Sequence, residues 1–322
     1  MQDQLVKFLA DVRSIEVQAL AQMERAPDIA GEPTLSRIFS DHLEETREHE
    51  RLVLDVLTQR GAETSTLKDL AGRVGGWAMI VFARINPDTP GKLVAHAFSY
   101  EHMEMAAYAL LEQAAERAND PVVAELAQRI ATQEKAMGQR LAAAFDQAVD
   151  ASLRAKAASD LPGELVAYLQ DAHAIETQAM QFLTVASGIA GAQPLADALR
   201  GHVEETETHR RLVEERLEAH DARPSRLQDT ALRIGGLNVA GFFAVQPDTS
   251  AKLAGFAFAF EHLEIAAYEL LARVAERAGD AATEATARRI ADEERAAAER
   301  VAGTWDAAMD AALEKLGVAA AT

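Results

Sequence analysis

The stretch that decides the fold is FSYEHMEMAAYALLEQAAERA at residues 98–118, because it returns as FAFEHLEIAAYELLARVAERA at residues 258–278. The shift is 160 residues (258 − 98 = 160), and the match continues without a gap: HLEETREH at 42–49 returns as HVEETETH at 202–209. Solenoid repeats have periods of roughly 20–50 residues, which is far shorter. The chain is therefore expected to contain two copies of one domain, at residues 1–157 and 158–322.

Each copy is expected to be all-α. Strong helix formers dominate the composition, which is 49% hydrophobic and only 5% aromatic. A β-rich fold would need more β-branched and aromatic residues. In copy one, proline beside a residue that can cap a helix predicts helix starts at Pro33, Pro90 and Pro121. A linker is expected from Arg154 to Leu161, with Pro162 opening copy two.

An extra short helix is expected between the second and third long helices of each copy. It begins at Ser65 in copy one and Ser225 in copy two, and carries the apolar segments GGWAMIVFARI (75–85) and GGLNVAGFFAV (235–245). Two interpretations stay open: a cross-connection packed over the bundle, or a dimer contact. The fold prediction is thus two tandem four-helix bundles, each with one short connecting helix, forming an internal pseudo-dimer.

The charge and composition exclude several classes of partner. The net charge of −19 argues against nucleic acid and anionic membranes and suits a protein that attracts cations. There is no cysteine, which excludes disulfides and thiolate metal sites and fits a reducing compartment. The N-terminal sequence has no signal-peptide pattern, and the longest apolar stretches are about half the roughly 20 residues of a membrane span. A cytoplasmic protein without a membrane partner is expected.

Acidic side chains interrupt the apolar face of all four long helices. In copy one the inward positions include Glu16 on the first helix, Glu45 between His42 and His49 on the second, Glu101 and Glu104 with Tyr108 on the third, and Glu134 on the fourth. A buried acid costs several kcal/mol unless it is paired or binds a metal ion. Four packed helices would bring these acids together.

The two copies supply an internal comparison. Surface charges change between them: Asp41 corresponds to Gly201, and Glu48 to Thr208. The inward set recurs in copy two as Glu176, His202, Glu205, His209, Glu261, Glu264, Tyr268 and Glu294. The inward acids are thus retained where the exposed ones differ.

Carboxylates with one or two imidazoles favour iron or manganese, and bridging carboxylates allow two ions to lie close together. The predicted ligands are Glu16, Glu45, His49, Glu101, Glu104 and Glu134, with Glu176, Glu205, His209, Glu261, Glu264 and Glu294 in copy two. His42, Tyr108, His202 and Tyr268 are expected to support the ligands through hydrogen bonds, as is His102. A salt bridge from His49 to Glu45 is the alternative to ligation.

HLEETREHERL (42–52) together with YEHMEMAAY (100–108) resembles the bacterial YciE/YciF-like family, stress-associated members of the ferritin-like superfamily. The resemblance covers the whole chain, once per copy. It implies a di-iron four-helix bundle in which two helices carry one Glu each and two carry Glu-x-x-His. It assigns Glu16 to helix one, Glu45 to helix two as a bridging acid, Glu101 or Glu104 to helix three, and Glu134 to helix four.

The sequence departs from that pattern in its histidines. Helix two has Glu45-x-x-x-His49 instead of Glu-x-x-His, and helix four has Met137 or Ala297 where a second His would stand. The expected site is therefore rich in carboxylates, with two iron ions per bundle or manganese in their place.

Three functions stay open. The first is a di-metal redox protein that oxidises Fe(II) or consumes O₂ or peroxide in stress protection, a ferroxidase-like or peroxidase-like oxidoreductase. The second is a non-enzymatic scaffold whose acids form ion pairs and whose apolar connecting segments bind a partner or a second copy. The third is a di-iron oxidase or oxygenase of an organic substrate.

Overall fold

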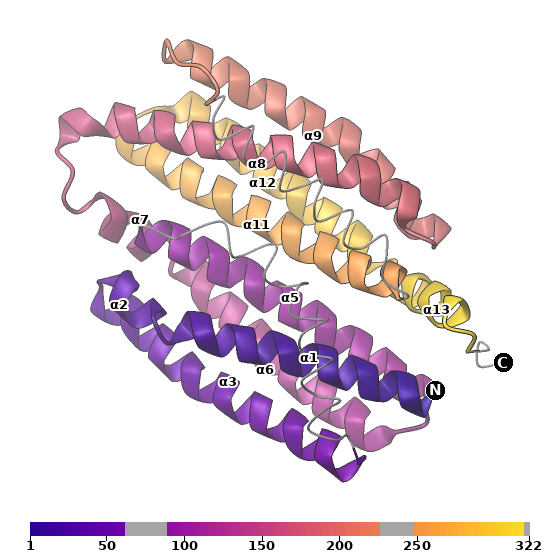
Figure 1. Cartoon of the computed structure of the whole chain (residues 1–322). Coiled ribbons are helices and arrows are strands. Elements are labelled where there is room, and N and C mark those ends of the chain that lie inside the picture. Colours follow the sequence, from indigo (N-terminus) through magenta and orange to yellow (C-terminus); the bar gives the residue numbers. More distant parts are fainter. Residues whose placement is uncertain (62–88, 226–247, 319–322) are drawn as a thin grey trace.

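The computed structural model describes residues 1–61, 89–225 and 248–318, and in these ranges it contains helices and no strand. This confirms the all-α prediction (Figure 1). The helices of copy one are α1 (Gln2–Met23), α2 (Ala26–Ala30), α3 (Pro33–Gln59), α5 (Pro90–Arg117), α6 (Pro121–Ala143) and α7 (Phe145–Leu153). A 3₁₀ turn at Ala158–Asp160 leads into copy two, with α8 (Leu161–Ile189), α9 (Gln193–Ala219), α11 (Thr249–Ala278), α12 (Ala281–Ala302) and α13 (Trp305–Lys315).

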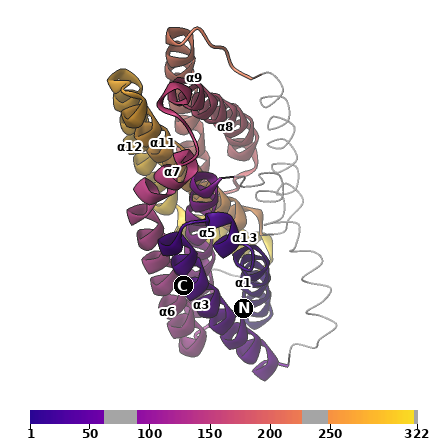
Figure 2. The ribbon, with the colours of Figure 1, turned by 90° about the vertical axis from the view of Figure 1, so that its left-hand side faces the viewer.

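The long helices form two four-helix bundles, as predicted. Helices α1, α3, α5 and α6 make one bundle, and α8, α9, α11 and α12 make the other; both views of the ribbon separate the two groups (Figures 1 and 2). The short helices α2, α7 and α13 were not predicted. Helix α6 ends at Ala143 and α7 begins two residues later at Phe145.

Side-chain caps fix the helix starts that the sequence predicts. The Glu32 carboxylate accepts a hydrogen bond from the Leu35 N–H (2.8 Å), the Thr89 hydroxyl accepts from Lys92 N–H (3.3 Å), and Asp120 accepts from Val123 N–H (3.2 Å). Each cap satisfies one of the N–H groups that have no partner within the helix, and proline at the next position lacks such a group. The predicted starts at Pro33, Pro90 and Pro121 are confirmed.

Helices α5 and α11 lie at the centre of the molecule, where the two bundles pack against each other. The Ser99 hydroxyl of α5 donates a hydrogen bond to the Ala259 carbonyl of α11 (2.7 Å). The imidazole rings of His102 and His262 stack between the bundles, with centroids 3.6 Å apart and planes 15° from parallel.

Ion pairs at the bundle interface repeat under the 160-residue shift. Arg117 binds Asp306 and Asp310 of α13, and the equivalent Arg277 binds the equivalent aspartates of α7, Asp146 and Asp150. The two bundles are thus related by an approximate two-fold axis, which places equivalent surfaces face to face.

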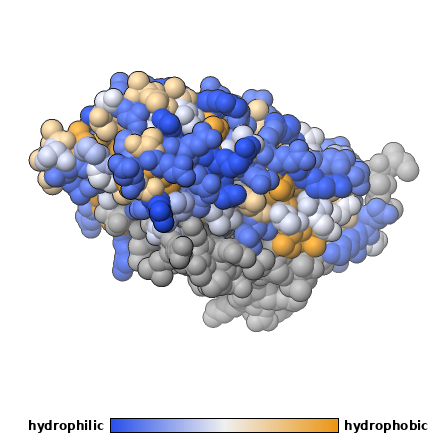
Figure 3. Space-filling view, turned by 90° about the horizontal axis from the view of Figure 1, so that it is seen from above, coloured by the Kyte–Doolittle hydropathy of each residue, from blue (hydrophilic) through white to orange (hydrophobic). Residues whose placement is uncertain are grey.

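Three further findings concern membrane-spanning helices, the surface and the connecting segments. In the part of the chain that the structure describes, no helix has the length and apolar character to cross a membrane. The face in Figure 3 is mostly hydrophilic where it is coloured, in keeping with the net charge of −19. The predicted connecting segments 75–85 and 235–245, and the predicted cap Ser65, lie outside the described residues, whereas Ser225 is the last described residue before such a range and is not in a helix.

Candidate metal centre

The buried face of α3 determines which of its polar residues point into the bundle. This face consists of Leu35, Phe39, His42, Thr46, His49, Val53, Val56 and Leu57. Seven residues make nearly two full turns, so His42 and His49 lie on one face. The stripe passes through Thr46, whose hydroxyl donates to the His42 carbonyl. Glu45 falls beside the stripe, and its side chain is 33% exposed.

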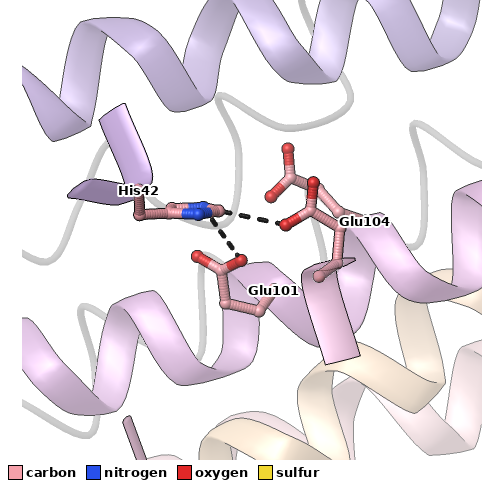
Figure 4. Close-up of side chains that lie close together, drawn as sticks. His42, Glu101 and Glu104 are labelled. Atoms are coloured by element: carbon pink, nitrogen blue, oxygen red, sulfur yellow. Dashed lines mark ion pairs between the residues drawn. The ribbon is translucent and has the colours of Figure 1, made fainter. Parts of the chain in front are cut away.

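Two groups of buried ligand atoms lie inside the first bundle and share one residue. His42, Glu101, Glu104 and Glu134 form the first group, and Glu16, His49 and Glu134 form the second; the ligand atoms of each group lie within 4.8 Å of one another. Figure 4 shows His42, Glu101 and Glu104 directed toward a common point. Since Glu134 belongs to both groups, the arrangement offers two adjacent cation positions with a carboxylate between them.

The distances show which imidazole nitrogen faces each group. His42 Nε2 is 3.1 Å from Glu101 Oε2 and 3.7 Å from Glu134 Oε2. His49 Nδ1 is 2.7 Å from Glu134 Oε1 and 3.7 Å from Glu16 Oε1. The two histidines therefore present opposite ring nitrogens, Nε2 and Nδ1, to the two oxygens of Glu134.

The Glu104 carboxylate is the clearest sign that the pocket fits a cation. Its side chain is fully buried, and neither oxygen has a hydrogen-bond partner among the residues that the structure describes. A buried polar group without a partner costs several kcal/mol. Four carboxylates and two imidazoles are a donor set suited to iron or manganese, so a pair of such ions would satisfy the unpaired oxygens.

Without metal ions the cluster must hold protons instead. Burial and the neighbouring charge of Glu134 raise the pKa of Glu16 to about 8. Burial also raises the pKa of Glu104 well above its ordinary value, with Glu134, Glu16 and Glu101 adding to the effect. Burial raises the pKa of Glu101 to about 7, although the charge of His42 opposes this shift.

The pKa values of His42, His49 and Glu134 are shifted in the direction that favours the charged form of each side chain. Burial lowers the pKa of His42, but Glu101 and Glu45 outweigh it, and the net pKa lies well above the ordinary value. Burial likewise lowers the pKa of His49, but the hydrogen bond and negative charge of Glu134 outweigh the effect of burial, so that the pKa of His49 is also raised. The pKa of Glu134 is lowered, because hydrogen bonding to His49 and the charge of His42 exceed the effect of burial. The metal-free cluster is thus a network of two imidazolium ions with ionised and protonated carboxyl groups.

A further layer of polar groups orients the candidate ligands. His42 Nδ1 is 3.0 Å from Glu45 Oε2, and Arg140 binds the same carboxylate at 2.5 Å. The Tyr108 hydroxyl donates to Glu16 Oε1 at 2.5 Å. A hydrogen bond on the outer nitrogen of a metal-binding histidine fixes its tautomer and ring orientation. Glu45 and Arg140 therefore hold His42 Nε2 toward the interior.

The second bundle repeats this geometry. Its two groups are His202, Glu261, Glu264 and Glu294, and Glu176, His209 and Glu294. His202 Nε2 is 2.8 Å from Glu261 and 3.1 Å from Glu294, and His209 Nδ1 is 2.7 Å from Glu294. Glu205 contacts His202 Nδ1 at 2.8 Å, and Tyr268 donates to Glu176.

The structure brings together most of the ligands predicted from the sequence, but Glu45 and His42 exchange their predicted roles, as do Glu205 and His202. The acids and histidines that it groups as candidate ligands include Glu16, His49, Glu101, Glu104, Glu134 and their equivalents Glu176, His209, Glu261, Glu264 and Glu294. Glu45 and Glu205, which were predicted as ligands, belong to neither group. His42 and His202, which were expected as supporting residues, belong to the groups of candidate ligands. The salt bridge proposed between His49 and Glu45 is replaced by the contact of Glu45 with His42. Tyr108 and Tyr268 lie where a supporting hydrogen bond was expected.

His102 lies away from the cluster. Its Nδ1 donates to the Phe98 carbonyl (2.6 Å), as His262 does to Phe258 (2.7 Å), and the two rings face each other between the bundles. Sequence reasoning missed Gln133 and Glu293, which contact His49 Nε2 and His209 Nε2. The available signal was their position directly before the inward acids Glu134 and Glu294.

Comparison with known proteins gives one family. The profile of a family described as a domain of unknown function (DUF892) matches residues 1–154 and again residues 163–314. The two matched regions agree with the two bundles. No solved structure matches the chain.

Proposed function

This chain belongs to the family of the domain of unknown function DUF892, and we propose that each of its bundles binds a pair of iron or manganese ions for redox chemistry. The ions would act on Fe(II), O₂ or peroxide in stress protection, as expected for a ferritin-like oxidoreductase. The resemblance to the YciE/YciF-like proteins supports the same proposal.

The observation that carries the proposal is the unpaired Glu104 carboxylate beside two inward-facing imidazoles, found again at Glu264 in the second bundle. A structural ion-pair network would leave as few buried oxygens as possible without a partner. Here both oxygens of Glu104 and of Glu264 lack one among the described residues. Keeping such a group twice is costly in a purely structural role.

The residues of the first bundle divide into two cation positions. His42 and Glu101 would hold one ion, and His49 and Glu16 the other. Glu104 belongs to the first of these positions, and Glu134 lies where it can contact both. The four carboxylates carry four negative charges when ionised, which balances two divalent ions in a site from which water is excluded.

The surrounding groups control protons and access. The Tyr108 hydroxyl oxygen lies 2.5 Å from Glu16 Oε1 and donates a hydrogen bond to it, which stabilises the ionised form of that carboxylate. Glu45 and Arg140 are each about a third exposed, and they lie between His42 and solvent. Bound Fe(II) ions would supply one electron each, which matches the two electrons that reduction of peroxide to water requires.

The test is the metal content of the reconstituted protein. The purified chain is loaded anaerobically with Fe(II) or Mn(II), desalted, and analysed by mass spectrometry. About four ions per chain are expected, two for each bundle. Fewer than one ion per chain under both conditions would refute the proposal.

The ion pairs of the cluster favour one alternative, a structural network without metal. His49 with Glu134 and His42 with Glu101 are already well-placed pairs. On this alternative Glu104→Gln would leave the metal content of the protein unchanged. On the metal proposal that variant binds less metal in the first bundle, while the second bundle serves as the internal control.

The proposal includes the domain division at residues 157 and 158, in the exposed segment between α7 and α8. A cytoplasmic location is part of it, since a chain without cysteine suits a reducing compartment. Association of two chains into a homodimer is a separate proposal, tested by the mass of the protein in solution.

A further inference from the structure

The two metal-type clusters differ at one contact, on the outer nitrogen of the second histidine. In the first bundle His49 Nε2 lies 3.2 Å from the amide oxygen of Gln133. In the second bundle His209 Nε2 lies 2.8 Å from the carboxylate oxygen Oε2 of Glu293. Positions 133 and 293 are equivalent under the repeat (293 − 133 = 160).

The geometry fixes the direction of both hydrogen bonds in a metal-bound protein. His49 and His209 turn Nδ1 toward the inward acids, at 2.7 Å from Glu134 and Glu294 respectively. An imidazole that binds a cation through Nδ1 carries its hydrogen on Nε2. That N–H must then donate outward, to an amide in one bundle and to a carboxylate in the other.

A carboxylate acceptor makes the imidazole a better ligand than an amide acceptor does. The negative charge stabilises positive charge on the ring and raises the electron density on the nitrogen that faces the cation. The other histidine of each bundle serves as a control, because His42 and His202 both contact a carboxylate, Glu45 or Glu205. Among the outer contacts of the four candidate histidine ligands, the change from carboxylate to amide is therefore confined to His49.

Glu293 has the support needed to stay ionised in this role. Its other oxygen, Oε1, accepts a hydrogen bond from Arg289 Nε at 2.8 Å, and the side chain is 36% exposed. In the first bundle Arg129 stands at the position of Arg289, so that bundle has the arginine without the acid.

We propose that Glu293, through His209, makes the cation position formed by Glu176, His209 and Glu294 the tightest in the chain, so that the first ion enters the second bundle. This inference rests on the proposed metal-binding function and adds a ranking of the sites. Changing a partner of a metal-binding histidine typically alters affinity 10- to 100-fold. Since glutamine still accepts a hydrogen bond, we expect a difference of about tenfold, at the lower end of that range.

The test is a titration of the metal-free, full-length chain with Mn(II), with free Mn(II) followed by its electron paramagnetic resonance signal. For the wild-type chain the first ion should bind about tenfold more tightly than the others. Glu293→Gln should abolish this tight class. Gln133→Glu should create a second tight ion, a gain that damage to the fold cannot produce. Asp292→Asn, which removes an exposed acid at the neighbouring position, should leave the wild-type curve unchanged.

The possible failures can be told apart. If the wild-type, Glu293→Gln and Gln133→Glu chains bind equal amounts of Mn(II) with the same curve, the ranking is overturned and the metal-binding function stands. If the wild-type chain binds neither Mn(II) nor Fe(II), the proposed function is overturned and this inference with it. If Asp292→Asn also loses the tight class, charge alone explains the effect and the role of Glu293 is refuted.

Discussion

Loading of one bundle with two divalent ions is predicted to release about four protons, a number that follows from the charge of the cluster. The raised pKa values of His42 and His49 favour the imidazolium form of both side chains. The raised pKa of Glu16, about 8, and that of Glu104, which lies well above its ordinary value, favour the protonated form of these carboxyl groups. A buried cluster of four carboxyl groups and two imidazoles is electrically neutral when it holds four protons in all, and a net charge there would be costly.

Two divalent ions bring four positive charges and need four ionised carboxylates and two neutral imidazoles. The two imidazolium protons and the two carboxyl protons must leave, which is about two protons per ion. The apparent binding constant for each ion should therefore increase about 100-fold per pH unit near neutrality. The direction is fixed, since raising the pH removes protons that compete with the metal.

The assay is isothermal titration calorimetry with Mn(II) in buffers of equal pH and different ionisation enthalpy. The slope of the observed enthalpy against the ionisation enthalpy gives the number of protons released. For the whole chain we expect about eight, four from each bundle. A release below about one proton per bundle would refute the description of the metal-free cluster, because the carboxylates would then be ionised before the metal binds.

Four further predictions concern individual acids of the clusters. Glu134→Gln changes the carboxylate shared by both positions of the first bundle and should leave about half of the metal content of the chain. Glu45→Gln should keep the metal content and weaken metal binding about tenfold. Equal metal contents in the wild-type and Glu134→Gln chains would contradict the assignment of Glu134 as a shared ligand. Glu104→Leu replaces an unpaired buried acid by an apolar side chain. It should raise the free energy of unfolding of the metal-free protein, measured in guanidinium titrations, by about 1–4 kcal/mol. A metal-free variant less stable than the wild-type chain would argue against a cost of burying Glu104. Glu16 and Glu176 have pKa values of about 8 in the folded chain, above the ordinary 4.5, so their stabilisation is complete below about pH 4.5 and lost as the pH rises through about 8. With a chelator present, the melting temperature should fall as the pH rises from about 4.5 to about 8, whereas the melting temperature of the Mn(II)-loaded protein should not. Parallel curves for the two forms would contradict the raised pKa values of Glu16 and Glu176.

The fold was largely predictable from the sequence because the repeat and the helix caps are local signals. Pro33, Pro90 and Pro121 begin helices in the structure, each after a side chain that accepts an early backbone N–H. The short helices α2, α7 and α13 were missed. Helix α6 ends at Ala143 without a glycine or proline there, so nothing local in the sequence marks that boundary.

The site was predictable in its acids and less so in its histidines. Glu16, Glu101, Glu104 and Glu134 interrupt apolar stripes, and the structure buries all four completely. On α3 the apolar pattern allowed the buried stripe to pass through position 45 or 46, and packing selects Thr46.

That choice turns Glu45 outward and makes it the partner of His42. The donor set therefore contains two imidazoles per bundle, from α3 in the first and from α9 in the second, where the sequence had indicated only His49 and His209. A shift of one position on a helix rotates a side chain by about 100°, and the sequence pattern does not resolve such a shift.

The most direct test of the central claim is the position of bound metal in a crystal of the Mn(II)- or Fe(II)-loaded protein, located by anomalous scattering at the absorption edge of the metal. The account predicts two peaks in each bundle, one between His42 and Glu101 and the other between His49 and Glu16, with Glu134 contacting both, and an equivalent pair beside Glu294. Peaks confined to the exposed acidic surface, or bundles without any peak in fully loaded protein, would contradict it.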